Sequence, residues 1–222
     1  MGVLVSGRGS NLEALLTAAP EGIEPVLVVS NRPGARALEV AAAHEVPCLV
    51  LRRVDFGGDH AARDAAIGAA FERAGVELGV MAGYDQLLRP AYFAAFSGRT
   101  INIHPSLLPA HGGLGMLGMA VHRSVLAADD PETGVTIHEV TADLDAGPIV
   151  AQTRVPVLAG DDPETLAARV LAEEHRLLVT TLMEIAATSG DQARKGSAGM
   201  MRASMADGVR AASDTTQERP GS

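Results

Sequence analysis

The first 104 residues alternate between short apolar runs and segments with helical periodicity. The apolar runs are residues 2–5, 25–29, 47–51, 78–81 and 100–104. The helical patterns between them are at residues 12–16, 35–44, 59–74 and 90–96. Strands that alternate with helices form right-handed βαβ units, so this alternation predicts an α/β fold with a mainly parallel sheet.

The second half of the chain follows a different pattern. Residues 134–140 and 149–157 read as strands joined by a short connection, so we expect them to be antiparallel. Acidic residues before Pro163 predict the start of a helix that ends near Ala187. Beyond this helix the apolar pattern is lost. We therefore predict one domain at residues 1–189 and a flexible, low-complexity C-terminal tail at residues 190–222.

Composition narrows the class of protein. A net charge of -9 argues against a protein that binds nucleic acid through a broad basic face. Cys48 is the only cysteine, so no internal disulfide can form, and its apolar setting predicts an inert buried thiol. We find no signal-peptide pattern and no apolar run long enough to cross a bilayer. The expectation is a cytoplasmic protein that binds neither nucleic acid nor membrane.

A glycine-rich turn, residues 6–11, joins the first strand to the first helix. Ser10 and Glu13 have the spacing of a capping box. The third glycine of a dinucleotide fingerprint is missing, and no Gly-Lys-Ser/Thr follows for a Walker A loop. The turn therefore predicts either a cradle for one phosphate, with backbone donors at Gly9, Ser10 and Asn11, or an ordinary capped strand–helix turn.

Asn102 and His104 end the fifth apolar run, directly before Pro105. Residues two apart on a strand point to one face, and open α/β sheets bind ligands at the carboxyl ends of their strands. With Asp145 from a later acidic loop, this pair can stabilise an oxyanion and move a proton. No serine or cysteine stands ready to attack, so we predict acyl-type transfer to a nucleophilic substrate. The alternative is a polar strand end bonded to its own turn.

A metal site is a further alternative, because four histidines invite it: His104, His111, His122 and His138. No carboxylate–histidine spacing typical of a hydrolytic metal site supports it. We therefore predict that the protein holds no metal.

Four motifs, taken together, point to a known family. They are residues 5–11, 82–84, 101–109 and 143–148. Over roughly residues 3–187 the chain resembles the folate-dependent phosphoribosylglycinamide formyltransferases. The resemblance implies a single formyltransferase-type Rossmann-like domain, with a mainly parallel sheet, antiparallel C-terminal strands and helices on both faces. It also implies transfer of a formyl group from 10-formyltetrahydrofolate to the amine of glycinamide ribonucleotide in purine biosynthesis.

The resemblance implies roles for individual residues. Asn102 would polarise the formyl oxygen, His104 would act as general acid, and Asp145 would assist the histidine through its opposite charge. The residues implied to bind the ribonucleotide are Gly9, Ser10, Asn11 and Glu174. Those implied to border the folate are Asp85, Gln86, Leu87, Leu88, Asn102, Thr141, Ala142, Asp143, Leu144 and Asp145. On residues alone, the region around Glu174 reads equally as a solvated polar patch.

Two departures from the family pattern lie near the implied folate site. Asp85-Gln86 stands where the family usually carries Met-Arg or Met-Lys, and His60 stands about where many members have an arginine near the folate tail. Alternatives left open are a formyltransferase or deformylase with another acceptor, or a non-catalytic nucleotide-binding homologue. The partners we expect are small-molecule substrates, with the protein a monomer or homodimer.

Overall fold

The computed structural model describes residues 1–212, with side chains as far as Thr188. The chain divides into two units, Met1–Met183 and Glu184–Ser222. The first unit contains the whole sheet and the candidate site. In the part of the chain that the structure describes, no helix is long and apolar enough to cross a membrane.

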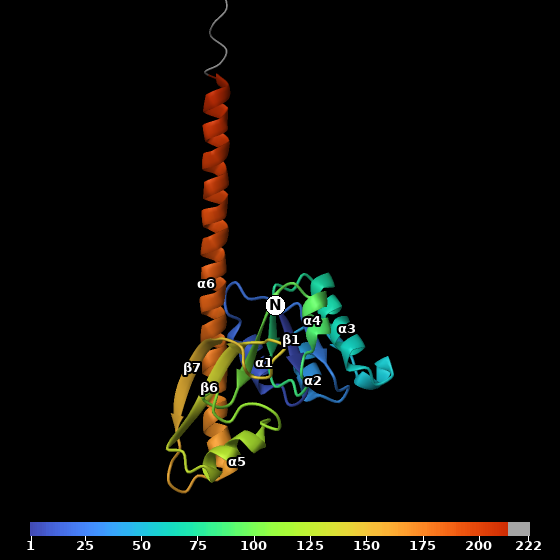
Figure 1. The fold of residues 1–222 in the computed structure, drawn as a ribbon, viewed down its shortest axis with the longest axis vertical. Helices are drawn as coiled ribbons and strands as arrows, with labels where there is room; N and C mark the ends of the chain where they lie inside the picture. Colours follow the sequence, from blue (N-terminus) through green and yellow to red (C-terminus); the bar gives the residue numbers. More distant parts are fainter. Residues whose placement is uncertain (213–222) are drawn as a thin grey trace, which may run out of the picture. The chain divides into compact units, whose positions relative to one another are not determined.

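The first unit is built on one seven-stranded sheet with the strand order β3-β2-β1-β4-β5-β6-β7. Figure 1 shows β6 and β7 side by side. The strands are β1 (Gly2–Val5), β2 (Leu27–Ser30), β3 (Cys48–Val50), β4 (Leu78–Met81), β5 (Arg99–His104), β6 (Glu132–Glu139) and β7 (Ile149–Pro156). Strands β1 to β5 pair in parallel, whereas β6 pairs antiparallel with both β5 and β7. The predicted mainly parallel sheet with antiparallel C-terminal strands is therefore confirmed.

Within residues 1–212, six α-helices and one 3-10 helix connect or follow the strands. They are α1 (Ser10–Ala18), α2 (Arg36–Ala43), the 3-10 helix η1 (Arg53–Phe56), α3 (His60–Arg73), α4 (Pro90–Ala95), α5 (Met119–Ala127) and α6 (Pro163–Ala212). Side-chain caps explain why α3 and α6 begin where they do. The Asp59 carboxylate accepts from the backbone of Ala61 and Ala62, and the Asp162 carboxylate accepts from the Thr165 N–H at 2.8 Å.

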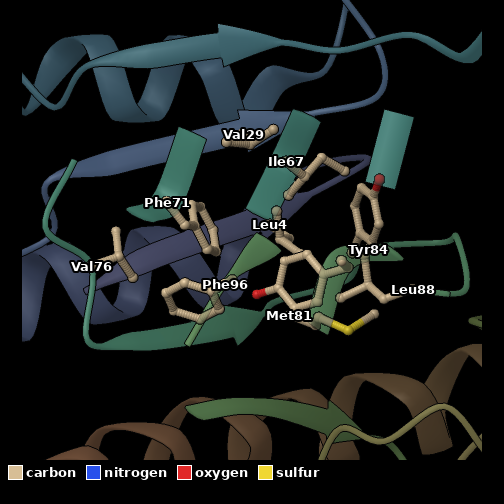
Figure 2. Close-up of a cluster of buried hydrophobic side chains, with 10 residues drawn as sticks. Leu4, Val29, Ile67, Phe71, Val76, Met81, Tyr84, Leu88 and Phe96 are labelled. Carbon is tan, nitrogen blue, oxygen red and sulfur yellow. The ribbon is translucent and has the colours of Figure 1, made fainter. Parts of the chain in front are cut away.

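Successive strand residues point to opposite faces of the sheet. Side chains on both faces of β1 are buried, so both faces are covered there. Leu4 belongs to a buried cluster with Ile67 and Phe71 of α3, and Figure 2 shows these side chains grouped with others of the cluster. Val3 and Val5 are fully buried on the other face of β1. The carboxyl ends of the central strands carry the candidate site.

Helix α6 extends further than the sequence predicted. Its end was expected near Ala187, but it continues to Ala212. The added segment is rich in alanine and methionine and contains no proline, so nothing in it forbids helix. Residues 213–222 of the predicted tail lie outside the described residues. The boundary at residue 189 and the flexibility of the tail stay predictions.

Two local predictions are wrong. Helix α1 has no side-chain cap, because Gly9 stands at the N-cap with φ 78° and the Ser10 side chain does not cap it. Cys48 is exposed rather than buried, because β3 is the edge strand of the sheet. Partial desolvation still raises the pKa of the Cys48 thiol, which disfavours the reactive thiolate.

Candidate active site

A cavity of about 730 Å³ lies where β1, β4 and β5 end. Its lining includes residues 7–11, 81–88, 102–105 and 113–119, with further residues from α5, β6, the loop after β6 and α6. All but two of the residues implied for catalysis or substrate binding line this cavity. The exceptions are His60 and Ala142. The roles assigned to the lining residues stay predictions.

His104 stands at the end of β5 with 4% of its surface exposed. Its Nε2 donates to the backbone carbonyl of His111 at 2.9 Å, since a carbonyl can only accept. Its Nδ1 lies 3.9 Å from the Asp145 carboxylate, slightly beyond hydrogen-bond distance. The ring therefore has one nitrogen fixed to the backbone and the other facing a negative charge.

Asn102 has a partner that the sequence analysis did not assign. Its Nδ2 lies 3.1 Å from Nε2 of His138, the residue opposite it in the antiparallel β5–β6 pairing. Nδ1 of His138 donates to the Glu139 carbonyl at 2.9 Å, so Nε2 of the neutral ring accepts from the amide. Burial lowers the pKa of His138 and favours this neutral form. The amide is thus oriented by His138, and its second hydrogen takes no part in this bond.

Asp145 ties two loops together beside these side chains. Its carboxylate accepts from the Gly113 N–H at 2.8 Å and lies 3.7 Å from Nε2 of His138. Asp145 also has φ 52°, a left-handed conformation that costs a non-glycine residue on the order of 1–3 kcal/mol. The carboxylate is thus held between the imidazoles of His104 and His138.

The glycine-rich turn supplies the opposite end of the cavity. Because α1 has no side-chain cap, its first-turn N–H groups have no side-chain acceptor. A β-carbon on Gly9 would lie 2.7 Å from the Cα of Ala37, so the turn is pressed against α2. Unbonded N–H groups at a helix N-terminus, facing a cavity, form a suitable site for an anion.

Asn11 connects the turn to α6. Its Nδ2 donates to the Glu174 carboxylate at 2.6 Å, and its Oδ1 is buried without a hydrogen-bond partner. Burial raises the pKa of Glu174, although the bond from Asn11 opposes this. Glu174 is therefore part of the cavity wall and not of a solvated patch.

The side chains of Asp85 and Gln86 form hydrogen bonds with other side chains of the protein. The Asp85 carboxylate accepts from Ser6 Oγ at 2.9 Å and from Asn31 Nδ2 at 2.8 Å, and it also pairs with Arg32. Burial opposes ionisation of Asp85, but hydrogen bonds from Asn31, Gln86 and Ser6 outweigh it and lower its pKa. The carboxylate is thus engaged within the protein, which leaves backbone as the main polar surface here.

His60 lies apart from the cavity, at the start of α3. Its Nε2 lies 3.0 Å from Nη1 of Arg53. Desolvation lowers the pKa of His60, and the charges of Arg89, Arg53 and Arg63 add to that effect. A neutral His60 would not replace an arginine as a cation, so its proposed part in binding the folate tail stays a prediction.

Of the four histidines named in the metal alternative, His104, His122 and His138 line the cavity and His111 does not. Among residues whose placement is described, no group of three or more His, Cys, Asp or Glu side chains could hold a metal ion.

A family model described as formyl transferase matches residues 1–182. The chain belongs to the formyl transferase family. It is 44% identical over 189 residues to phosphoribosylglycinamide formyltransferase of Mycobacterium tuberculosis, a match that covers 83% of each protein. It is 37% identical to the chloroplastic phosphoribosylglycinamide formyltransferase of Arabidopsis thaliana, with 81% of this chain covered. That match spans only 62% of the Arabidopsis protein, less than two thirds of its length.

A solved member of the family has the same fold. The crystal structure of glycinamide ribonucleotide transformylase 1 from Symbiobacterium toebii matches with a TM-score of 0.78 and 40% sequence identity. The match covers 84% of this chain and 87% of the other. The predicted formyltransferase fold and the resemblance to the family are both confirmed.

Proposed function

We propose that this chain transfers the formyl group of 10-formyltetrahydrofolate to the amine of glycinamide ribonucleotide, a step of purine biosynthesis. The observation that carries the proposal is the grouping of Asn102, His104 and Asp145 on one cavity with an uncapped helix N-terminus. The similarity to enzymes named phosphoribosylglycinamide formyltransferase supports the choice of acceptor. Both substrates are small molecules, and the protein acts as a monomer or homodimer.

The anion site orients the ribonucleotide. The phosphate of the ribonucleotide binds the first-turn N–H groups of α1, and the ribose hydroxyls contact Glu174. The buried, unpartnered Oδ1 of Asn11 is an additional acceptor beside that position. These contacts direct the amine of the substrate toward Asn102 and His104.

The chemistry then needs a polarised carbonyl and a proton. The amine bonds to the formyl carbon as the bond to N10 of the folate breaks; the amine loses a proton and N10 gains one. Asn102 donates its free amide hydrogen to the formyl oxygen, where negative charge develops. Because Nε2 of His104 is fixed to a carbonyl, Nδ1 is the nitrogen that exchanges the proton. Asp145 stabilises the protonated ring across 3.9 Å.

A turnover assay tests the proposal and separates the alternatives. Protein is supplied with 10-formyltetrahydrofolate, with and without glycinamide ribonucleotide, while tetrahydrofolate, formate and the formylated ribonucleotide are measured. We expect tetrahydrofolate and formylated product in equal amounts, only when the ribonucleotide is present. Formate released without an acceptor would identify a deformylase. Ribonucleotide binding with no turnover would identify a non-catalytic homologue.

A further inference from the structure

His111 belongs to a hydrogen-bonded chain that ends on His104. Its Nε2 donates to the Asp130 carboxylate at 2.6 Å, and its Nδ1 lies 2.9 Å from Oγ of Ser124 on α5. The side chain is only 14% exposed. Both ring nitrogens are therefore engaged, and the ring is held against α5 and the residues that follow it.

The backbone of His111 is the part that reaches the site. Its carbonyl accepts the hydrogen bond from Nε2 of His104 at 2.9 Å, with Ser106 Oγ at 3.5 Å. His111 has φ 53°, a left-handed conformation that is uncommon for a residue with a side chain. Its two side-chain bonds tie this residue to Ser124 and Asp130.

The order serine–histidine–aspartate invites comparison with a hydrolytic triad. Neither Ser124 nor His111 lines the cavity, although His122 of the same helix does. A nucleophile without access to a substrate has no catalytic use. The chain of bonds is therefore better explained by its effect on His104.

We propose that His111 is a positioning residue for His104, held in place by Ser124 and Asp130. By fixing the carbonyl of residue 111, it keeps the hydrogen of His104 on Nε2 and directs Nδ1 toward Asp145. This inference rests on the proposed function, in which Nδ1 of His104 exchanges the proton. If the ring were displaced, or if its hydrogen moved to Nδ1, the unprotonated nitrogen would no longer be the one that faces the substrate.

Variants that release the His111 ring test this role. Asp130→Ala removes the acceptor, and we expect kcat to fall about tenfold with KM for both substrates unchanged, as for a small misplacement of a catalytic group. Asp130→Asn keeps an acceptor oxygen and should restore most of kcat. Asp129→Asn is the matched control, because it makes the same charge change at the exposed neighbouring residue and should match the wild type.

A spectroscopic readout separates positioning from a merely structural role. In ¹⁵N-histidine NMR spectra we expect neutral His104 to be the Nε2–H tautomer in the wild type and a mixture of tautomers in Asp130→Ala. Unchanged kcat and an unchanged tautomer in Asp130→Ala would overturn the inference. So would a loss of stability alone. If Asp130→Ala does not fold, Ser124→Ala decides by the same two measurements.

A His104→Ala variant, measured in parallel, keeps this inference distinct from the proposed function. Full turnover by His104→Ala would refute the proposed role of His104, and the positioning role with it. Loss of turnover in His104→Ala, together with normal kcat and tautomer in the Asp130 and Ser124 variants, would refute the positioning role alone.

Discussion

At the scale of single residues, Asp145 is the side chain that contacts the largest number of groups in the proposed mechanism. Its carboxylate is shared between the backbone of Gly113 and the imidazoles of His104 and His138. It can therefore act on the chemistry by its charge and on the loop by its hydrogen bond. A substitution that removes only the charge distinguishes these two effects.

Asp145→Asn is that substitution. Asparagine tolerates a left-handed φ and its amide oxygen can still accept from Gly113, so the fold should be unchanged. Without the charge beside His104, we expect kcat to fall by about 10²–10⁴-fold, the usual contribution of positioned acid–base catalysis. Asp129→Asn is the matched control, because Asp129 also has φ 52° and is exposed. Wild-type turnover by Asp145→Asn across the pH range would contradict the assigned role.

Gly9 gives a second prediction at this scale. A β-carbon there would lie 2.7 Å from both Cα and Cβ of Ala37, at a backbone φ of 78°. Gly9→Ala should therefore lower the free energy of unfolding by at least about 1–3 kcal/mol, the usual cost of such strain, in urea titrations. Gly7→Ala is the comparison, because a β-carbon there meets nothing within 4 Å and stability should not change. Equal stabilities of the two variants would show that α2 yields to the added carbon.

At the scale of secondary-structure elements, local sequence patterns predicted the features that depend only on neighbouring residues, such as the bounds of a strand or the start of a helix. The strand at residues 78–81 has the predicted bounds because its apolar run has sharp polar and glycine limits. The start of α6 was predicted because Asp162 and Pro163 act within one turn. The exposure of Cys48 was missed, because it depends on which strand lies at the edge of the sheet. His138 was missed as the partner of Asn102, because the register of β6 on β5 brings the two together.

The contact between α1 and α6 leads to a prediction about stability and affinity. Burial raises the pKa of Glu174, so its ionised form destabilises the folded state at neutral pH. Glu174→Gln keeps an acceptor for Asn11 and removes that cost. We expect a higher urea midpoint than the wild type at pH 7.5, with the difference lost below the ordinary glutamate value of 4.5. KM for the ribonucleotide should rise, since the variant offers its ribose a weaker acceptor.

The neighbouring Glu173→Gln variant is the control for Glu174→Gln. Glu173 is paired with Arg176 one turn along α6, an ion pair whose loss should cost no more than about 1 kcal/mol. Its ribonucleotide KM should equal that of the wild type. A Glu174→Gln protein that is less stable than Glu173→Gln at pH 7.5 would contradict the inferred cost of the buried charge.

At the scale of the whole first unit, the site is assembled from both halves of the sheet. The parallel half supplies the anion-binding turn, Asn102 and His104, whereas the antiparallel half and its loop supply His138 and Asp145. This division explains the limit of prediction from sequence. The motifs pointed to most of the residues that line the cavity, but the pairing of these residues depends on strand order and register, which are set by packing of the whole unit.

The same packing makes the stability of the unit depend on pH through histidines that are buried or half-buried. Burial lowers the pKa of His122, His138 and His175, so between the ordinary value of 6.5 and their folded values the unfolded chain binds more protons. The contribution of these histidines to stability is therefore fully present above pH 6.5 and is lost as the pH falls below it. In the Glu174→Gln background, which removes the opposite contribution of that carboxyl, urea titrations should show a lower free energy of unfolding at pH 5.5 than at pH 7.5. Adding His122→Gln should reduce that difference, whereas the exposed His44→Gln should not. A difference unaffected by His122→Gln would mean that this ring becomes charged without opening the fold.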